Sequence, residues 1–273
     1  MPPLTGNLKE AALRIRKRAV KLSAKGSCFL GSALSVVDII VALYGSVIRF
    51  DPKNPYDMNR DRFVLSKGHA VPALYGLLVE LGLLTEAHLE GHLQPDTFIY
   101  WHPNEKLPGI DVSTGSLGQG FSIACGLALG AKIDKSDARV FVVLGDGELQ
   151  EGVIWESALF SSKYQLGNLI AIIDRNKIQA NIETEKLMPL EPLDRKWESF
   201  GWKVIIVDGH DIDALKEAYK SIPSLSTKPH VIIAETVRGK GIPSIEGKID
   251  KWIVKTTEDE ALQLIRDLDE INV

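Results

Sequence analysis

Short apolar runs that end abruptly at glycine or polar residues recur along this chain, and stretches with helical spacing separate them. Runs of β-branched residues without alternating polar positions are typical of strands buried on both faces of a parallel sheet. The helices between them supply the crossover connections that such a sheet needs. The pattern therefore predicts an α/β fold with a mainly parallel sheet. The expected strands are 62–65, 140–144, 169–173, 202–207 and 230–235.

Apolar residues at helical spacing also predict where the helices lie. The first helix is expected to begin after Asn7 or Thr5 and to end at Gly26. Ser35 is a good N-cap residue, so we expect a second helix at 36–47. Further helices are expected at 73–81, 120–131, 148–164, 211–219 and 258–268.

The connections between these elements are uneven in length. Two prolines make 51–55 irregular, and 91–110 and 180–197 are predicted to be long loops. The 273 residues contain no recognisable repeat, low-complexity tract or linker. We therefore expect a single domain over 1–273.

Composition indicates the cellular location of the chain and excludes some classes of binding partner. A formal net charge of −4 gives no basic field for nucleic acid. The two cysteines, Cys28 and Cys125, lack metal-ligand spacing and are expected to be buried thiols in a reduced compartment. No stretch has the pattern of a signal peptide or a membrane span. These features predict a cytoplasmic protein without nucleic-acid or membrane partners. The basic residues expected on a solvated face of the first helix are Arg14, Arg16, Lys17, Arg18 and Lys21.

The segment 139–178 carries the clearest candidate chemistry. One buried strand stops at Asp146, which lies between two glycines, and the next strand stops shortly before Asn176. Ligands of open parallel sheets collect beyond the carboxyl ends of the strands. A carboxylate, an amide and a main-chain carbonyl suit Mg²⁺, and glycine lets the backbone approach a bulky anion. The Gly-Asp-Gly sequence alone is equally typical of a strand-ending turn, but its pairing with Asn176 favours a metal and diphosphate site.

Three further residues place polar groups near this predicted sheet edge or in a long loop. His69 follows the first strand at a junction with a helix, where it either caps locally or meets an anion. His102 precedes a proline in the loop 91–110, and it lies either on the surface or in a cleft. Arg238 stands near glycines after the last strand, where a guanidinium suits phosphate oxygens, although exposed arginines are common.

Several motifs together resemble the transketolase family of thiamine diphosphate enzymes. The motifs are SALSVVDIIVALY, SKGHA, STGSLGQG, GDGELQEG with GNLIAIIDRN, VDGHD and TVRGKGI, and they extend over nearly the whole chain. The resemblance implies a three-layer α/β/α fold. It also implies a site for thiamine diphosphate and Mg²⁺, with Ca²⁺ or Mn²⁺ as alternative ions.

The resemblance assigns roles to individual residues. Asp146, Asn176 and the main-chain oxygen of Ile178 are expected to hold the metal ion. His69 and His102 are the expected catalytic residues. The expected cofactor contacts are His69, Gly115, Ser116, Leu117, Gly147, Asn176 and Arg238, with Leu117 against the aminopyrimidine ring.

The resemblance covers only the first part of a transketolase. In the family, a pyrimidine-binding domain brings the glutamate that activates the cofactor, and a C-terminal domain follows. The activation step requires a carboxylic acid at the aminopyrimidine. We therefore expect a second chain with these domains, an α2β2 hetero-oligomer, and Glu151 and Glu156 at the subunit interface.

The implied function is that of the N-terminal subunit of a two-chain transketolase, which transfers a two-carbon ketol unit from a ketose phosphate to an aldehyde or aldose. Phe29 and Ile253 stand where the family has histidines that contact substrate or cofactor. Loss of proton-transfer groups typically slows such steps ~10²–10⁴-fold. Three explanations compete: a different substrate, substitutes from the partner chain, or weak catalysis. We favour a different substrate.

Three alternative functions share parts of this pattern. The first is a transketolase-like transferase whose acceptor is not a sugar or is bound to a carrier. The second is a cofactor-holding protein without turnover. The third is the α subunit of a 2-oxoacid dehydrogenase, against which SKGHA and STGSLGQG weigh.

Overall fold

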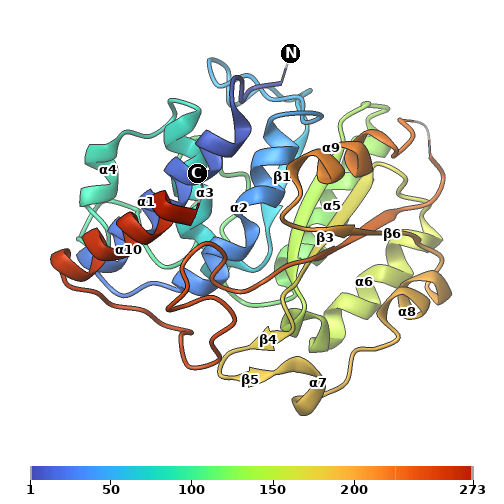
Figure 1. Ribbon diagram of the computed structural model, residues 1–273. Helices are drawn as coiled ribbons and strands as arrows, with labels where there is room; N and C mark the ends of the chain where they lie inside the picture. The colour runs from blue at the N-terminus through green and yellow to red at the C-terminus, as the bar shows by residue number, and fades with distance from the viewer. Residues whose placement is uncertain (1, 225, 272–273) are drawn as a thin grey trace.

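A five-stranded parallel sheet forms the centre of the computed structural model, which describes residues 2–224 and 226–271 (Figure 1). The strands lie in the order β1-β2-β3-β7-β6, and each pairs with its neighbours in parallel. The predicted α/β class is therefore confirmed. The strands are β1 (Arg62–Leu65), β2 (Val140–Gly145), β3 (Leu169–Arg175), β6 (Lys203–Asp208) and β7 (His230–Glu235).

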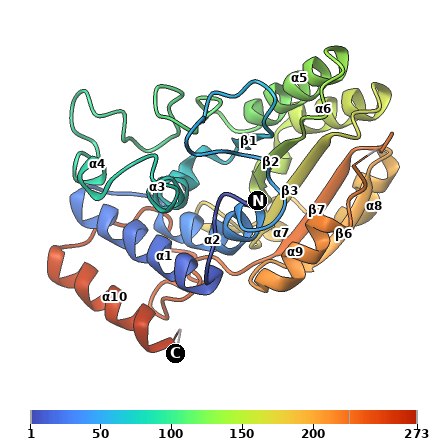
Figure 2. The ribbon, with the colours of Figure 1, turned by 90° about the horizontal axis from the view of Figure 1, so that it is seen from above.

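Helices cover both faces of this sheet, as the view from above shows (Figure 2). One face packs against α2 (Leu30–Tyr44), α3 (Val71–Glu80) and α9 (Ile212–Lys220). The other packs against α5 (Gln119–Ile133), α6 (Gly152–Lys163) and α8 (Leu193–Ser199). Outside α2 and α3 lie α1 (Leu8–Lys25) and, against it, α10 (Glu258–Ile271). The three-layer arrangement is thus confirmed.

The alternation of side chains along each strand explains these layers. In β2, Phe141 and Val143 join the core that contains α2 and α3, whereas Val142 and Leu144 join the core that contains α5 and α6. All four are buried, as expected for a strand covered on both faces. Because both faces of the central strands are filled, a ligand can reach them only at their ends.

Two expected boundaries near the sheet edge are wrong. The second helix begins at Leu30, so Ser35 lies inside α2 and does not cap it. Its hydroxyl lies 2.6 Å from Asp174 Oδ2, and this buried tertiary contact replaces the expected capping role. Asp174 and Arg175, expected to follow the third strand, belong to β3.

Short elements interrupt the segments that were expected to be loops. The predicted loop 91–110 is confirmed as irregular, but α4 (Glu86–Glu90) precedes it. At the start of the predicted loop 180–197, β5 (Ile182–Glu183) forms a hairpin with the preceding β4 (Ile178–Gln179), and α7 (Thr184–Leu187) follows. Two 3-10 turns, η1 (Gly68–Ala70) and η2 (Gly147–Gln150), follow β1 and β2 within one or two residues.

The segment after β7 links the C-terminal part of the chain to the N-terminal part. Cys28 and Val254 exchange two main-chain hydrogen bonds of 2.9 and 2.8 Å. The amide of Thr256 donates to the carbonyl of Ser23 at 3.0 Å. Residues 236–257 therefore cross the carboxyl ends of the strands and end beside α1 and α2 (Figure 1).

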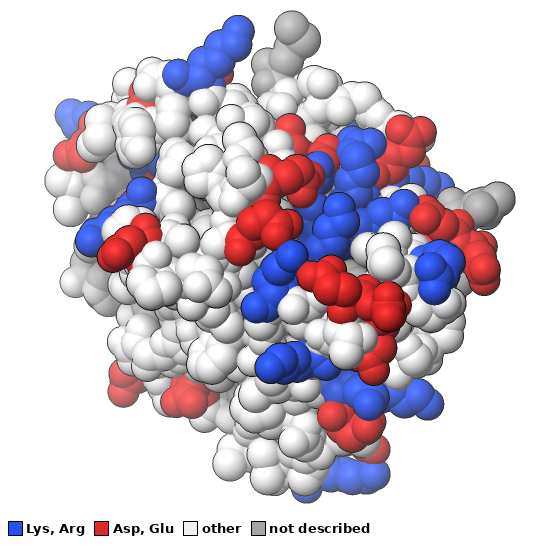
Figure 3. Space-filling model, turned by 90° about the vertical axis from the view of Figure 1, so that its left-hand side faces the viewer, with Lys and Arg blue, Asp and Glu red and all other residues white. Residues whose placement is uncertain are grey.

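The basic residues of α1 are mostly paired with acids. Lysines, arginines and acidic side chains are interspersed on the side of the molecule where α1, α4 and α10 lie (Figure 3). Arg14 and Arg18 pair with Glu80, and Lys17 pairs with Asp269. The solvated face expected from the sequence is wrong for one member, because Arg16 is 5% exposed.

Two further expectations concern burial and hydropathy. Cys28 and Cys125 are buried free thiols, as predicted. No helix in the described part of the chain is long and apolar enough to cross a membrane.

Candidate functional site

A cavity of about 260 Å³ lies at the carboxyl ends of β2 and β3. Its lining comes from distant parts of the sequence, from Ser32 on α2 to Trp252 before α10. The structure therefore brings together most of the residues that the sequence singled out. Those that line the cavity are His69, Leu117, Asp146, Gly147, Asn176, Ile178 and Arg238.

Asp146 supplies a buried carboxylate at the end of β2. Its Oδ1 accepts the N–H of Gly147 at 2.7 Å, and its Oδ2 accepts the N–H of Lys177 at 2.5 Å and Arg175 Nη1 at 3.1 Å. Burial and, to a lesser degree, the charge of Asp174 raise the pKa of Asp146 to about 6. A cation beside the carboxylate would favour its ionised form, so this environment suits a metal ligand.

Asn176 is oriented by hydrogen bonds at both ends of its amide. Its Nδ2 donates to Asp174 Oδ2 at 3.0 Å, and its Oδ1 accepts the N–H of Ile178 at 3.0 Å. An amide oxygen has two lone pairs, so Oδ1 keeps one for a further partner. Within residues 2–224 and 226–271 no group of three or more His, Cys, Asp or Glu could hold a metal ion. A metal here therefore depends on Asp146 together with amide and main-chain oxygens.

A buried ion pair lies beneath this site, and sequence reasoning did not identify it. Lys67 and Asp174 pair through Nζ and Oδ2, with side chains 1% and 0% exposed. Asp174 also accepts from Ser35, Asn176 and Thr236. Burial alone would raise the pKa of Asp174, but the Lys67 ammonium and these hydrogen bonds lower it overall. The signal was present, because Lys67 belongs to the SKGHA motif beside His69.

Arg238 brings unpaired donors to the cavity. Its Nη1 donates to the carbonyl of Ala180 at 2.5 Å, while its Nε and Nη2 are buried and find no hydrogen-bond partner among the described residues. Burial lowers the pKa of this guanidinium, a sign of incomplete compensation. A methyl group on Gly31 would lie 3.1 Å from the Arg238 side chain. The guanidinium is therefore held tightly and has free donors, as an anionic ligand requires.

Four aromatic rings cluster at one side of the cavity. The Phe29 ring lies 5.3 Å from His69, 6.4 Å from His102 and 5.4 Å from Trp252, measured between centroids. Ser32 Oγ lies 2.8 Å from His69 Nε2. Burial, followed by the charge of Lys67, lowers the pKa of His69 to about 3, and burial also lowers that of His102. Both imidazoles are therefore neutral near pH 7.

The structure separates some expected site residues from the cavity. Among the described residues, His102 lies outside the lining and packs against Gly115, where an added methyl would be 3.1 Å from its ring. Ser116 is exposed. Ile253 is 54% exposed, whereas the preceding Trp252 lines the cavity. Its position next to Ile253 was the signal that could have identified Trp252.

Glu148 connects the loop before α5 to the end of β2. It is buried, and its two carboxylate oxygens accept the N–H groups of Gly118 at 2.8 Å and Gly145 at 3.0 Å. Burial raises the pKa of this carboxyl. The contact holds Leu117 at the cavity, and the GDGELQEG motif offered the only hint of it.

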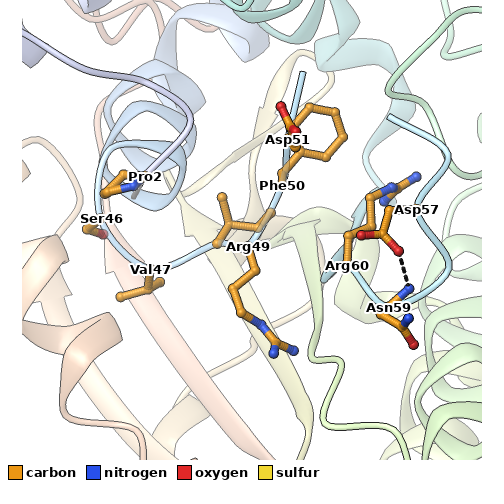
Figure 4. A pocket seen from close by; sticks show the side chains of 10 residues that line it. Pro2, Ser46, Val47, Arg49, Phe50, Asp51, Asp57, Asn59 and Arg60 are labelled. Carbon is orange, nitrogen blue, oxygen red and sulfur yellow. Dashed lines mark hydrogen bonds between the residues drawn. The ribbon is translucent and has the colours of Figure 1, made fainter. Parts of the chain in front are cut away.

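A different hollow, of about 490 Å³, surrounds residues 46–60 (Figure 4). Arg49 pairs with Asp61 and Asp137, and Arg60 pairs with Asp111. This region lies before β1, away from the carboxyl ends of the strands. Its guanidinium groups are already paired, and it includes no residue that the sequence singled out.

A family profile described as "Transketolase, thiamine diphosphate binding domain" matches residues 9–268. The chain belongs to the transketolase family. A mutant transketolase from Pichia stipitis shares its fold with a TM-score of 0.86 and 33% identity over 95% of this chain. This chain covers 40% of that transketolase.

Two shorter relatives align with this chain over most of their own length. One is a subunit of the apulose-4-phosphate transketolase of Phocaeicola vulgatus, 40% identical over 238 residues, which cover 87% of this chain and 84% of that protein. The 6-deoxy-6-sulfo-D-fructose transketolase subunit SqwG of Clostridium sp. (strain MSTE9) is 40% identical over 255 residues, with 93% of each chain covered. In length, this transketolase-family chain therefore resembles proteins named as separate subunits.

One surface of the transketolase-family chain is notably apolar. Glu151 and Glu156, expected at an interface, are exposed at the start and middle of α6. No described atom lies within 4 Å of a methyl group placed on Gly126 or Gly130 of the neighbouring α5. The exposed apolar side chains of these two helices and their ends are Ile123, Ile133, Leu159, Phe160 and Tyr164. Such patches commonly mark interaction sites.

Proposed function

We propose that this chain is the thiamine-diphosphate-binding subunit of a two-chain transketolase, active only with a partner chain. The cavity at the ends of β2 and β3 carries the proposal, because it combines a buried carboxylate, an oriented amide and unpaired guanidinium donors. Those groups fit Mg²⁺, Ca²⁺ or Mn²⁺ and a diphosphate. The chain's agreement in length with proteins named as separate transketolase subunits supports the split arrangement.

The chain's own residues have separate tasks in this proposal. Asp146, Asn176 and the main-chain oxygen of Ile178 would hold the metal ion, while Gly147 and Arg238 would bind the diphosphate. The contact of an added methyl on Gly147 with Gln179, at 2.8 Å, leaves no room for a side chain there. When bound, thiamine diphosphate supplies the carbon nucleophile and electron sink for ketol transfer.

The two histidines have environments suited to proton transfer with substrate oxygens. His69 lines the cavity, and both it and His102 lie beside the Phe29 ring. Because burial keeps both imidazoles neutral, each can offer one donor and one acceptor nitrogen. We assign His69 to cofactor and substrate contact and His102 to the substrate side.

The partner is proposed to carry the pyrimidine-binding domain and to form an α2β2 assembly through the α5–α6 face. The exposed apolar side chains and the open glycines of this face support that assignment. Glu151 and Glu156 would lie at the same interface.

Replacing Leu159 with glutamate should weaken association with the partner chain by at least about 10-fold, because a charge would be buried at the interface. The fold should be preserved, since Leu159 is 59% exposed. A titration followed by light scattering measures the association. Ile206→Glu, at a residue 57% exposed on β6, is the matched control and should associate normally. Equal affinity of both variants would place the interface elsewhere.

The aromatic cluster supports a substrate different from that of ordinary transketolases. Phe29 presents a ring without polar atoms beside both histidines, so it cannot hydrogen-bond a substrate hydroxyl. Two relatives are named for different substrates, apulose 4-phosphate and 6-deoxy-6-sulfo-D-fructose. A transferase with a non-sugar or carrier-bound acceptor is the second candidate favoured by this apolar wall.

The Phe29→His variant should discriminate more strongly between an acceptor aldehyde with a 2-hydroxyl and its deoxy analogue. An apolar wall changes the ratio of kcat/KM between two such substrates by no more than about 100-fold. A histidine that hydrogen-bonds the 2-hydroxyl should raise this ratio by about 10-fold. The values of kcat/KM for glycolaldehyde and acetaldehyde give the ratio. Phe29→Leu is the control and should leave it unchanged. An unchanged ratio in Phe29→His would mean that the partner chain reads this hydroxyl.

Reconstitution tests the proposed function as a whole. The chain would be combined with the product of the neighbouring gene, Mg²⁺, thiamine diphosphate and a ketose phosphate, and release and transfer of the two-carbon unit would be measured. Cofactor binding without turnover on a panel of aldehyde acceptors would favour the non-catalytic, cofactor-holding role. Reduction of lipoamide would favour a 2-oxoacid dehydrogenase.

A further inference from the structure

A buried ion pair behind the sheet holds a histidine that the proposed function does not use. Arg16 of α1 donates from Nη1 and Nη2 to the two carboxylate oxygens of Asp38 on α2, at 3.1 and 2.5 Å. Both side chains are 6–7% exposed. Asp38 Oδ2 also lies 2.8 Å from Nδ1 of His210, which precedes α9. Two neighbouring helices and a histidine 172 positions beyond Asp38 therefore meet at one carboxylate.

The opposite side of the His210 ring binds the main chain. The amide of Val237 donates to Nε2 of His210 at 2.8 Å. A main-chain N–H can only donate, so Nε2 is the unprotonated acceptor and Nδ1 carries the proton that is donated to Asp38. The two contacts thus select one neutral tautomer of His210. Arg16 and Asp38 fix the ring so that its acceptor faces Val237.

Val237 lies between Thr236, which contacts a buried carboxylate, and Arg238, which lines the cavity at the ends of β2 and β3. Before it, Thr236 donates its hydroxyl to the buried Asp174. After it, Arg238 extends its unpaired Nε and Nη2 at the cavity. The direction of the main chain at Val237 therefore determines where the Arg238 side chain begins.

Neighbouring contacts show that this short segment is held at each residue. Gly209, just before His210, donates its N–H to the carbonyl of Glu235 at 2.7 Å, and a methyl on Gly209 would be 2.3 Å from Thr236. On the far side, the N–H of Gly239 donates to the carbonyl of Gly31 at 2.9 Å. At Val237 the anchoring group is the side chain of His210.

We infer that His210, oriented by Asp38 and Arg16, is a positioning residue that sets Arg238 for the diphosphate through the amide of Val237. His210 is not among the described residues that line the cavity of Arg238, and it lines a separate hollow of about 450 Å³ together with Arg16 and Asp38. The inference rests on the proposed function for the identity of the ligand. The anchoring of Val237 itself does not depend on that function.

The test compares two variants of His210 in the reconstituted pair of chains. His210→Phe keeps a ring of similar size but loses both hydrogen bonds, whereas His210→Gln keeps an acceptor near the position of Nε2. Thiamine diphosphate affinity at saturating Mg²⁺ should fall about 3- to 10-fold in His210→Phe, the typical effect of one hydrogen bond, and should largely recover in His210→Gln. Once cofactor is saturating, kcat should change less than cofactor affinity.

A double-mutant cycle with Arg238→Ala separates positioning from a general structural effect. If His210 acts through Arg238, His210→Phe should not weaken cofactor binding further in the Arg238→Ala background. The same loss in both backgrounds, or wild-type affinity of His210→Phe, would overturn the inference.

Hydrogen exchange of the Val237 amide provides a second measurement that needs no cofactor. The amide should be protected in the wild-type chain, exchange faster in His210→Phe, and regain protection in His210→Gln. Equal exchange in the wild type and His210→Phe would also overturn the inference. Failure of the wild-type pair to bind thiamine diphosphate would instead reject the proposed function, and the anchoring of Val237 would still be decided by exchange.

Discussion

Replacing Asp146 with alanine should lower the affinity of the reconstituted pair for Mg²⁺ and thiamine diphosphate by at least about 100-fold. In typical metal sites, loss of a residue that only orients a ligand already lowers metal affinity by about 10–100-fold. Asp146 is itself the one carboxylate among the proposed ligands. Its loss also leaves the buried guanidinium of Arg175 without one of its acids. Calorimetric titration of the cofactor in the presence and absence of Mg²⁺ measures the effect.

Two further variants make the Asp146 result specific. Asp146→Asn keeps the shape of the side chain and removes its charge, so it should also bind the metal poorly. Asp134→Asn changes a surface acid after α5 and should bind normally. Wild-type affinity of Asp146→Asn would exclude the carboxylate as a metal ligand. Removal of Mg²⁺ with a chelator should reproduce the defect in the wild-type pair.

Replacing Lys67 with methionine should lower the free energy of unfolding by about 3–5 kcal/mol, the typical cost of leaving one member of a buried ion pair without its partner. Asp174 would keep its three neutral donors but lose the ammonium. Urea denaturation of the single chain at pH 7 measures the difference. The double variant Lys67→Met with Asp174→Asn should recover part of the loss, because no charge would remain buried.

The pH dependence of the Lys67→Met effect has a definite sign. In the wild type the pKa of Asp174 is lower in the folded than in the unfolded chain, where it is ~3.9. Its ionised carboxylate therefore contributes to the free energy of unfolding above pH ~3.9, and this contribution is lost as the pH falls through the pKa of the folded chain. Without Lys67, burial dominates and the pKa of Asp174 rises. The variant should therefore be most destabilised near neutral pH and approach the wild type under acid conditions. An equal deficit at all pH values would contradict this account.

The central part of the fold could be predicted because its pattern is local. The strands β2 and β3 are unbroken apolar runs, and a helix between parallel neighbours places both carboxyl ends at one edge. For this reason Asp146 and Asn176 were expected together, and they line one cavity. The family motifs added His69, Leu117 and Arg238 to the same wall.

The residues that hold this wall in place could not be predicted from local pattern. Lys67 and Asp174 are 107 positions apart, and Asp38 and His210 are 172 positions apart. Neither pair produces periodicity or spacing that reveals its partner. The expectation that Arg16 is solvated was wrong for the same reason. A charged residue on a helix is usually exposed, and only a carboxylate from elsewhere in the chain makes its burial favourable.

The ties between Cys28 and Val254, and between Ser23 and Thr256, have a consequence for biosynthesis. The wall that bears Arg238 and Trp252 reaches the cavity only after the last strand has been made. A ribosome that has finished β2 and β3 has produced the proposed metal ligands but not the segment that closes over them. Chains that end before residue 236 would lack Arg238 and Trp252, so they should bind thiamine diphosphate more weakly than the full chain when each is mixed with the partner chain.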